Sequence, residues 1–183
     1  MRTNKLKTTG VILKLSLLIF ACGCLSLSSR SQNSYTYNQD STIVIDKAHN
    51  LMWMRYDYSC LKKGFLKCWD SIFVFEKEMN TVKYGGYNDW EVPSIAAYRT
   101  INNSKQQRQV YQEYFKESDS VFVWGKGPYS FWSRIEKGKY VASYISFIDG
   151  FATSGDKCRQ VAGGDWEGIA FAFSVRLVRR IKK

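Results

Sequence analysis

The 183-residue chain has one histidine, two prolines and no low-complexity segment. Few prolines and no repetitive linker argue against a string of domains, and the 45% apolar and 16% aromatic content is enough for one good core. With His49 as the only imidazole, we expect no zinc site, no other metal centre and no cofactor. His49 lies in an expected turn with no evident nucleophile or carboxylate partner, so a solvated turn residue is favoured over a catalyst.

The sequence also lacks an apolar run long enough to cross a bilayer, which takes about 20 residues. Its most apolar run is Leu15 to Ala21, which a basic head precedes and Cys22 follows. Basic, apolar and small residues in this order are typical of an export signal. The segment Ile19 to Cys22 resembles a bacterial lipobox, whose cysteine is lipidated and becomes the first residue of the mature chain. Cys24 is the alternative lipidation site, and a plain secretory signal with two unmodified cysteines is the competing interpretation.

These features divide the chain into three parts. We expect residues 1–21 to be a lipoprotein signal peptide, residues 22–40 a flexible tether rich in Ser and Asn, and residues 41–183 the folded domain. The lipobox resemblance implies anchoring through fatty acyl chains such as palmitate, which suffice for stable membrane attachment. Neither candidate cysteine is followed by Asp, which favours the outer membrane in a cell that has one, and the cell surface otherwise.

Negative charge is scarce relative to positive charge. The formal net charge is +11, and loss of residues 1–21, with four positive and no negative charges, leaves +7. Basic clusters attract acidic or sulfated polysaccharides, although they also simply solubilise a domain or face anionic lipid. Nucleic acid is not an expected partner of an exported, tethered protein. The candidate polyanion-binding residues are Lys62, Lys63 and Lys67 in one loop, Arg134, Lys137 and Lys139 in another, and Arg176, Arg179 and Arg180 near the end.

Three cysteines lie beyond the signal, and an oxidising compartment would allow them to pair. Cys60 and Cys68 are eight residues apart and could close a small loop. A bond from Cys158 to either of them is equally permitted by the sequence.

The remaining pattern predicts an α+β fold with an N-terminal hairpin, two or three helices and then an antiparallel sheet. Strands around Ile43 to Asp46 and Leu51 to Tyr56 flank a turn in which Asn50 takes a left-handed conformation. Expected helices cover Trp69–Lys83, with Ile72, Phe73, Met79 and Val82 as its apolar positions, then a segment from Ser94, then residues 106–118. Strands are expected at 120–125, 129–136, 140–150 and, as one long alternating strand, 168–181. In that last strand Phe171, Phe173, Val175 and Leu177 share one face, and Arg176 lies on the other.

Several motifs resemble the Lcl C-terminal domain family, a bacterial domain family named for a collagen-like adhesin. "VIDKAHNLMWMR" resembles the family's opening, "GGYNDWEVPSIAAYRTI" its central signature, "YSFWSR" and "YISFIDG" its strand motifs, and "FSVRLVRR" its closing motif. The motifs occur in the family's order over about Thr42 to Arg180. Fold-signature residues by this resemblance are Trp53, Trp69, Gly86, Asp89, Trp90, Pro93, Trp132, Gly150, Arg176 and Arg179.

The resemblance implies a C-type-lectin-like fold, shared with formylglycine-generating enzymes. In that fold Gly85 and Gly86 would close the first helix, Asp89 would accept backbone hydrogen bonds and Trp90 would fill the core. Pro93 would precede the second helix, with Ser94 as its N-cap.

Enzymatic activity is not expected, because those enzymes bind copper(I) through two neighbouring thiols and Cys158 has no nearby cysteine in the sequence. The oxygen-rich motifs of calcium-dependent lectins are also missing. The resemblance therefore favours a non-catalytic binding module, possessing either a sulfated or acidic polysaccharide ligand or a structural, protein-binding role in the envelope.

Overall fold

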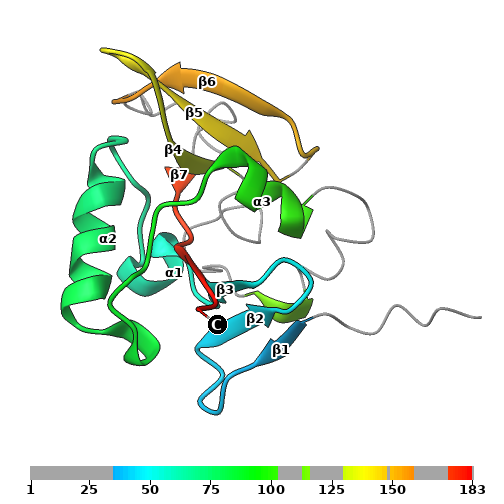
Figure 1. Ribbon diagram of the computed structural model, residues 1–183. Helices are drawn as coiled ribbons and strands as arrows, with labels where there is room; N and C mark the ends of the chain where they lie inside the picture. Colours follow the sequence, from blue (N-terminus) through cyan, green and yellow to red (C-terminus); the bar gives the residue numbers. More distant parts are fainter. Residues whose placement is uncertain (1–34, 103–112, 116–129, 148, 159–172, 183) are drawn as a thin grey trace, which may run out of the picture. The chain divides into compact units, whose positions relative to one another are not determined.

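The computed structural model describes residues 35–102, 113–115, 130–147, 149–158 and 173–182, which all lie in one compact unit, Asn33–Lys183. The helices and strands alternate little along the chain, which confirms the α+β class (Figure 1). The elements are β1 Tyr35–Tyr37, β2 Ile43–Asp46, β3 Leu51–Met54, α1 Tyr58–Lys62, α2 Ser71–Thr81, the 3₁₀ turn η1 Tyr84–Gly86, α3 Ile95–Asn102, β4 Ser130–Gly138, β5 Val141–Ser146, β6 Ala152–Asp156, β7 Phe173–Ser174 and β8 Val178–Arg180.

The strands form two sheets rather than a hairpin followed by one antiparallel sheet. One sheet has the order β1-β2-β3-β8 and the other β6-β5-β4-β7. Among the described strands, every pairing is antiparallel except that of β4 with β7, which is parallel. Figure 1 shows the C-terminal segment, in red, running from β7 in one sheet to β8 in the other. One short stretch of chain therefore belongs to both sheets.

The N-terminal hairpin forms as predicted but gains a strand. β2 and β3 pair antiparallel from Ile43 opposite Met54 to Asp46 opposite Leu51, and Asn50 takes the expected left-handed conformation with φ of 54°. The predicted tether over residues 22–40 is wrong at its end, because β1 pairs with β2. Tyr35 is buried there, and its hydroxyl donates to the carbonyl of Thr100 at 3.0 Å. Because the Tyr35 side chain packs in the core, the backbone that carries it lies beside β2 and pairs with it.

The first long helix, α2, lies within the predicted range, but its apolar positions are partly different. Ile72, Phe75 and Met79 are buried, whereas Phe73 and Val82, expected in the core, are exposed. Spacings of three and four residues place positions 72, 75 and 79 on one helical face, and position 73 lies about 100° away from 72. Lys83, with φ of 51°, turns the chain after the helix, so the glycines do not end it.

Gly85 and Gly86 instead shape the following turn. Both have positive φ, and a Cβ atom on Gly85 would lie 2.4 Å from Cδ1 of Ile43. Glycine is therefore required at position 85 for the turn to approach β2.

The second helix, α3, begins as predicted. The hydroxyl of Ser94 accepts the backbone N–H of Ala97 at 3.1 Å, which is the N-cap interaction, and Pro93 precedes it. Tyr98 and Ile101 are buried. The expected helix over 106–118 and the strand over 120–125 lie outside the described residues, apart from Glu113–Phe115, where Tyr114 and Phe115 are buried.

The predicted tryptophans fill the core. Trp53, Trp69, Trp90 and Trp132 are all buried, in two clusters of apolar side chains. One cluster gathers around α2 and the other around α3. Phe173, Val175 and Leu177 are buried as expected, and Phe171 lies outside the described residues.

The long strand predicted over residues 168–181 is wrong where the structure describes it. The chain forms the two short strands β7 and β8, and the residues between them are buried on all sides. Arg176, predicted on an open face, has 0% exposure. Apolar residues do alternate along this segment, but the side chains on both of its faces are buried because the segment passes between the two sheets.

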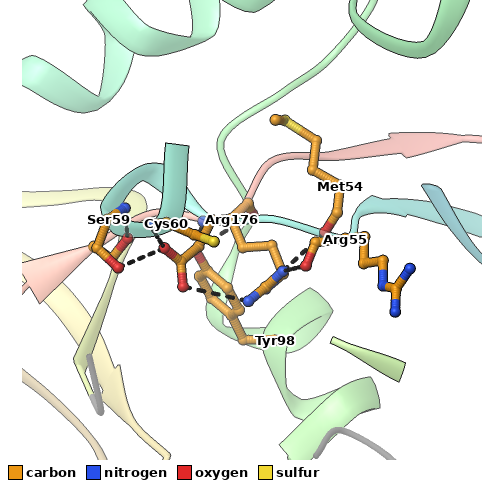
Figure 2. A network of polar contacts seen from close by, with 8 residues as sticks. Met54, Arg55, Ser59, Cys60, Tyr98 and Arg176 are labelled. Atoms are coloured by element: carbon orange, nitrogen blue, oxygen red, sulfur yellow. Dashed lines mark hydrogen bonds and ion pairs between the residues drawn. The ribbon is translucent and has the colours of Figure 1, made fainter. Parts of the chain in front are cut away.

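A buried ion pair holds this segment in place. Nη2 of Arg176 lies 3.3 Å from Oδ2 of Asp57, and neither side chain is exposed to solvent. Nη1 donates to the carbonyl of Met54 at 3.0 Å and to that of Arg55 (Figure 2). The hydroxyl of Tyr98 accepts the backbone N–H of Arg176 at 3.2 Å. The guanidinium thus joins the end of β3 to the C-terminal segment.

The same carboxylate builds the start of α1. Oδ1 of Asp57 accepts the backbone N–H of Cys60 at 2.9 Å and the hydroxyl of Ser59 at 2.6 Å. The backbone N–H of Ser59 in turn donates to Oγ of Ser174 at 3.1 Å. Both oxygens of Asp57 are therefore bonded, as a buried carboxylate requires.

We predict that Asp57→Asn lowers the free energy of unfolding by about 3 kcal/mol, because it leaves the Arg176 charge buried without its counter-ion. Asparagine keeps the shape and the Oδ1 acceptor, so the loss reports the charge. Urea denaturation at neutral pH measures it. Asp70→Asn, at an exposed aspartate, is the matched control and should change stability by less than about 0.5 kcal/mol. Equal stability of the two variants would show that the ion pair is dispensable.

Candidate polyanion-binding surface

The structure separates the predicted basic residues into buried and exposed groups. Arg176 is inside the core, and Arg179 is 6% exposed. Nε and Nη2 of Arg179 donate to the two carboxylate oxygens of Asp89 at 2.6 and 3.2 Å, and its guanidinium lies 3.9 Å from the ring centroid of Tyr87. Both arginines were predicted to bind a polyanion at the surface, and for both that prediction is wrong. Arg180 is exposed, as predicted.

Asp89 has a different role from the one its turn position suggested. Its carboxylate accepts side-chain N–H groups of Arg179 and Lys182, the latter at 2.9 Å, where backbone donors were expected. Hydrogen bonds from Arg179 and then Lys182 hold the pKa of Asp89 well below its usual range. The signature aspartate therefore anchors β8 to the loop after η1.

Two exposed cations already have carboxylate partners. Nζ of Lys62 pairs with Glu78, which connects α1 to α2, and Nη1 of Arg134 lies 3.0 Å from Oε2 of Glu91. A paired cation attracts an external anion less strongly because its field is partly cancelled. Lys63, Lys67, Lys137 and Lys139 remain as exposed predicted lysines with no ion pair among the described residues.

The disulfide joins Cys68 to Cys158, so the Cys60–Cys68 loop is wrong. The two Cα atoms are 4.2 Å apart although 90 residues separate them in the chain. The backbone N–H of Trp69 donates to the carbonyl of Lys157 at 2.6 Å, which brings the two segments side by side. Cys60 lies in α1, where its N–H is bonded to Asp57, so its position is set by the core.

The junction around the disulfide also includes the turn between β4 and β5. The backbone N–H of Lys157 donates to the carbonyl of Tyr140 at 2.9 Å, and Val141 pairs with Asp156. Lys157 itself is buried, with Nζ bonded to Glu136 and 4.5 Å from the ring centroid of Trp69. Three segments distant in sequence are therefore fastened together by a covalent bond, backbone hydrogen bonds and a buried cation.

We call the exposed side chains of Lys67, Lys137, Lys139 and Tyr140 the junction surface. Lys67 comes from the first predicted basic loop, and Lys137 and Lys139 come from the second. The sequence placed these lysines in separate clusters. Lys67 precedes Cys68 of the disulfide, and Lys139 precedes Tyr140, whose carbonyl bonds Lys157 next to Cys158. Asp70 and Asp156 are exposed carboxylates of the same segments, so electrostatic attraction to a polyanion is moderated there.

Two elements of this surface were missed by sequence reasoning. β6, which carries Asp156 and leads to Cys158, was not predicted, because its sequence "ATSGD" has few strand-forming residues. Tyr140 was read only as the start of a strand. The local sequence "KGKY", with two lysines and an aromatic around a glycine, was the available signal for an exposed turn.

Among the described residues, the other candidate groups form no cluster that could hold a metal ion. No cluster of three or more His, Cys, Asp or Glu side chains occurs in those ranges. Nδ1 of His49 lies 2.7 Å from Oδ2 of buried Asp46, so His49 does have the carboxylate partner that the sequence did not reveal. This contact closes the β2–β3 turn. In the described part of the chain, no helix has the length and apolarity needed to cross a bilayer.

The fold is that of an α+β domain whose two signature arginines, Arg176 and Arg179, are buried. The family model of the Lcl C-terminal domain matches residues 42–163, and the chain belongs to this family. The match confirms the resemblance read from the motifs, although "FSVRLVRR" lies beyond the matched range. No curated protein and no solved structure matches the chain.

We predict that peptide mapping of the non-reduced protein yields a peptide pair joined through Cys68 and Cys158. Replacing both by serine should lower the free energy of unfolding by about 4 kcal/mol, because the bond closes a loop of some 90 residues. Urea denaturation compares this double variant with Cys60→Ser, which should lose less than about 1 kcal/mol. Recovery of a Cys60–Cys68 linked peptide would contradict the assignment.

Proposed function

We propose that this protein is an exported, lipid-anchored, non-catalytic binding module with a C-type-lectin-like fold, and that it binds acidic or sulfated polysaccharide at the junction surface. One observation carries the binding proposal: the segment that follows Lys67 is fastened to residues 157 and 158 by the Cys68–Cys158 bond, and Lys157 is hydrogen-bonded to Tyr140 in the turn that Lys139 begins. A polyanion chain has charges repeated along its length, so it gains most from cations that lie on connected segments. Membership of the Lcl C-terminal domain family supports the assignment.

The expected binding is electrostatic and moderate in strength. Exposed lysines attract anions from a distance, and salt screens this attraction over about 8 Å at physiological ionic strength. The exposed carboxylates Asp70 and Asp156 reduce the net positive field but also disfavour polyanions that lie in the wrong position. Such a surface favours reversible attachment to an extended polymer.

A structural or protein-binding role in the envelope is the second candidate, because α2 and Val82, the residue after it, have exposed apolar side chains. Val74 and Val82 are 69% and 62% exposed, and Phe73 is 37% exposed. Exposed apolar side chains on one helix are a common feature of protein contacts. This role needs no glycan ligand.

We predict that the mature protein is retained on a dextran sulfate column and elutes with added salt. The triple substitution Lys67→Ala, Lys137→Ala and Lys139→Ala should abolish retention at physiological salt, since it removes the exposed cations of the junction surface. The matched control is Lys47→Ala, Lys77→Ala and Arg99→Ala, which removes the same charge from exposed positions elsewhere. The control should retain most of the binding.

Two outcomes would count against the binding proposal. Equal loss in the two triple variants would show that total charge is responsible and no local site exists. Free passage of the wild-type protein would exclude a sulfated polysaccharide ligand and favour the structural role.

The anchor is tested by intact mass and detergent partitioning of the exported protein. We predict that Cys22→Ala removes the mass of the acyl chains and shifts the protein into the aqueous phase, because the lipobox cysteine carries them. Cys24→Ala is the matched variant and should leave both properties unchanged. The reverse pattern would assign Cys24, and no effect of either change would indicate a secreted domain without an anchor.

A further inference from the structure

The turn between β4 and β5 presents an aromatic ring that the hairpin does not require. Gly138 pairs with Val141, so Lys139 and Tyr140 are the two residues of a tight turn. Neither turn residue has a positive φ, so the backbone accepts most residue types and does not itself call for an aromatic side chain. Tyr140 is 65% exposed. Neither the turn nor the core explains why a large aromatic residue occupies this position.

The backbone that carries this ring is held firmly. The carbonyl of Tyr140 accepts the N–H of Lys157 at 2.9 Å, next to Cys158 of the disulfide. The buried Lys157 side chain bonds Glu136 of β4, so the turn is fastened from two directions. A ligand that contacts the ring meets a position that is already ordered, and less conformational entropy is lost on binding.

Charge lies directly beside the ring. Nζ of Lys139 is 5.0 Å from the ring centroid of Tyr140. An anionic group that binds Lys139 would therefore be placed next to an aromatic face, whose π electrons give it partial negative charge. The C–H groups of a sugar ring carry partial positive charge and form a flat apolar patch that can pack on such a face. A linear polyphosphate has charge but no such patch.

We propose that Tyr140 is a specificity-determining residue that selects polyanions built from sugar rings over polyanions of equal charge without rings. In this arrangement Lys139 holds the sulfate or carboxylate of one sugar unit, and the exposed ring of Tyr140 packs against the unit that bears it. Lys67 and Lys137 attract both kinds of polyanion, whether or not the polymer contains sugar rings. This inference rests on the proposed function and names the ligand class of the same surface.

The test compares two ligands on one set of variants of the mature protein. Affinities for a dextran sulfate oligomer and for inorganic polyphosphate of matched charge are measured by calorimetry at the same salt concentration. Tyr140→Ala should weaken binding of the sulfated oligomer about fivefold to tenfold, as expected for loss of one aromatic packing contact. Its affinity for polyphosphate should change by less than about twofold, since no ring packs there.

Two further variants isolate the ring. Tyr140→Phe keeps the aromatic face and should bind both ligands like the wild type. Phe151→Ala removes another ring that is also 65% exposed but lies outside the junction surface, and it should leave both affinities unchanged. Thermal unfolding of each variant checks that the hairpin is intact.

The outcomes separate this inference from the function on which it rests. Equal weakening of both ligands by Tyr140→Ala, or no weakening of the sulfated oligomer, would overturn the role of Tyr140 and leave polyanion binding in place. A wild-type preference for polyphosphate would overturn it as well. Wild-type protein that binds neither ligand would overturn both proposals.

Discussion

The buried contact between Arg176 and Asp57 is the interaction on which the rest of the structure depends. Removing two charges from water is costly, and the cost is offset only when the pair has good geometry and makes further hydrogen bonds. Here the guanidinium reaches Asp57 and two backbone carbonyls at the end of β3, and it lies 4.8 Å from the ring centroid of Phe115. Hydrogen bonds are directional, so those of Arg176 help to specify where the C-terminal segment lies between the sheets. The burial of apolar side chains specifies this position as well.

A second arginine repeats this arrangement at the edge of the fold. Arg179 binds Asp89 through two hydrogen bonds and packs on Tyr87, which secures β8 to the loop that carries Trp90. The signature stretch "GGYNDWEVPS" thus has a structural explanation. Its Asp89 and Glu91 bond the closing strand β8, its Trp90 is buried in the core, and its Pro93 and Ser94 begin α3. Two of the chain's arginines stabilise the domain and are not available to a ligand.

The roles of residues in turns, helix caps and the core could be predicted from the sequence. The pairing of residues distant in the chain could not. Asn50 at the turn, Ser94 as N-cap and the buried tryptophans follow from conformational preference and size, which act over a few residues. Arg176 could not be placed in the same way, because alternation along a strand does not reveal whether the second face is covered. The partner of Cys68 was equally hidden, since three cysteines in one chain allow several pairings and only the fold selects one.

The arrangement of the basic residues could not be predicted from the sequence for the same reason. Lys67 and Lys139 are 72 residues apart in the sequence, and their segments are related through residues 157 and 158, by the Cys68–Cys158 bond and the hydrogen bond from Lys157 to Tyr140. In the proposed binding, their contribution depends on the tertiary structure more than on composition. The net charge of the chain predicted attraction to polyanions, but the distribution of carboxylate partners determines which cations remain to exert it.

The passage of the C-terminal segment through both sheets has a consequence for the order of folding. Asp57 and Arg176 are 119 residues apart, and the strands β1 to β3 lack their neighbour β8 until the end of the chain is present. Contacts of such long range form late and slowly. During synthesis, every nascent chain that stops short of residue 173 lacks the segment that joins the two sheets, so the domain acquires its native core only after β7 and β8 have been made.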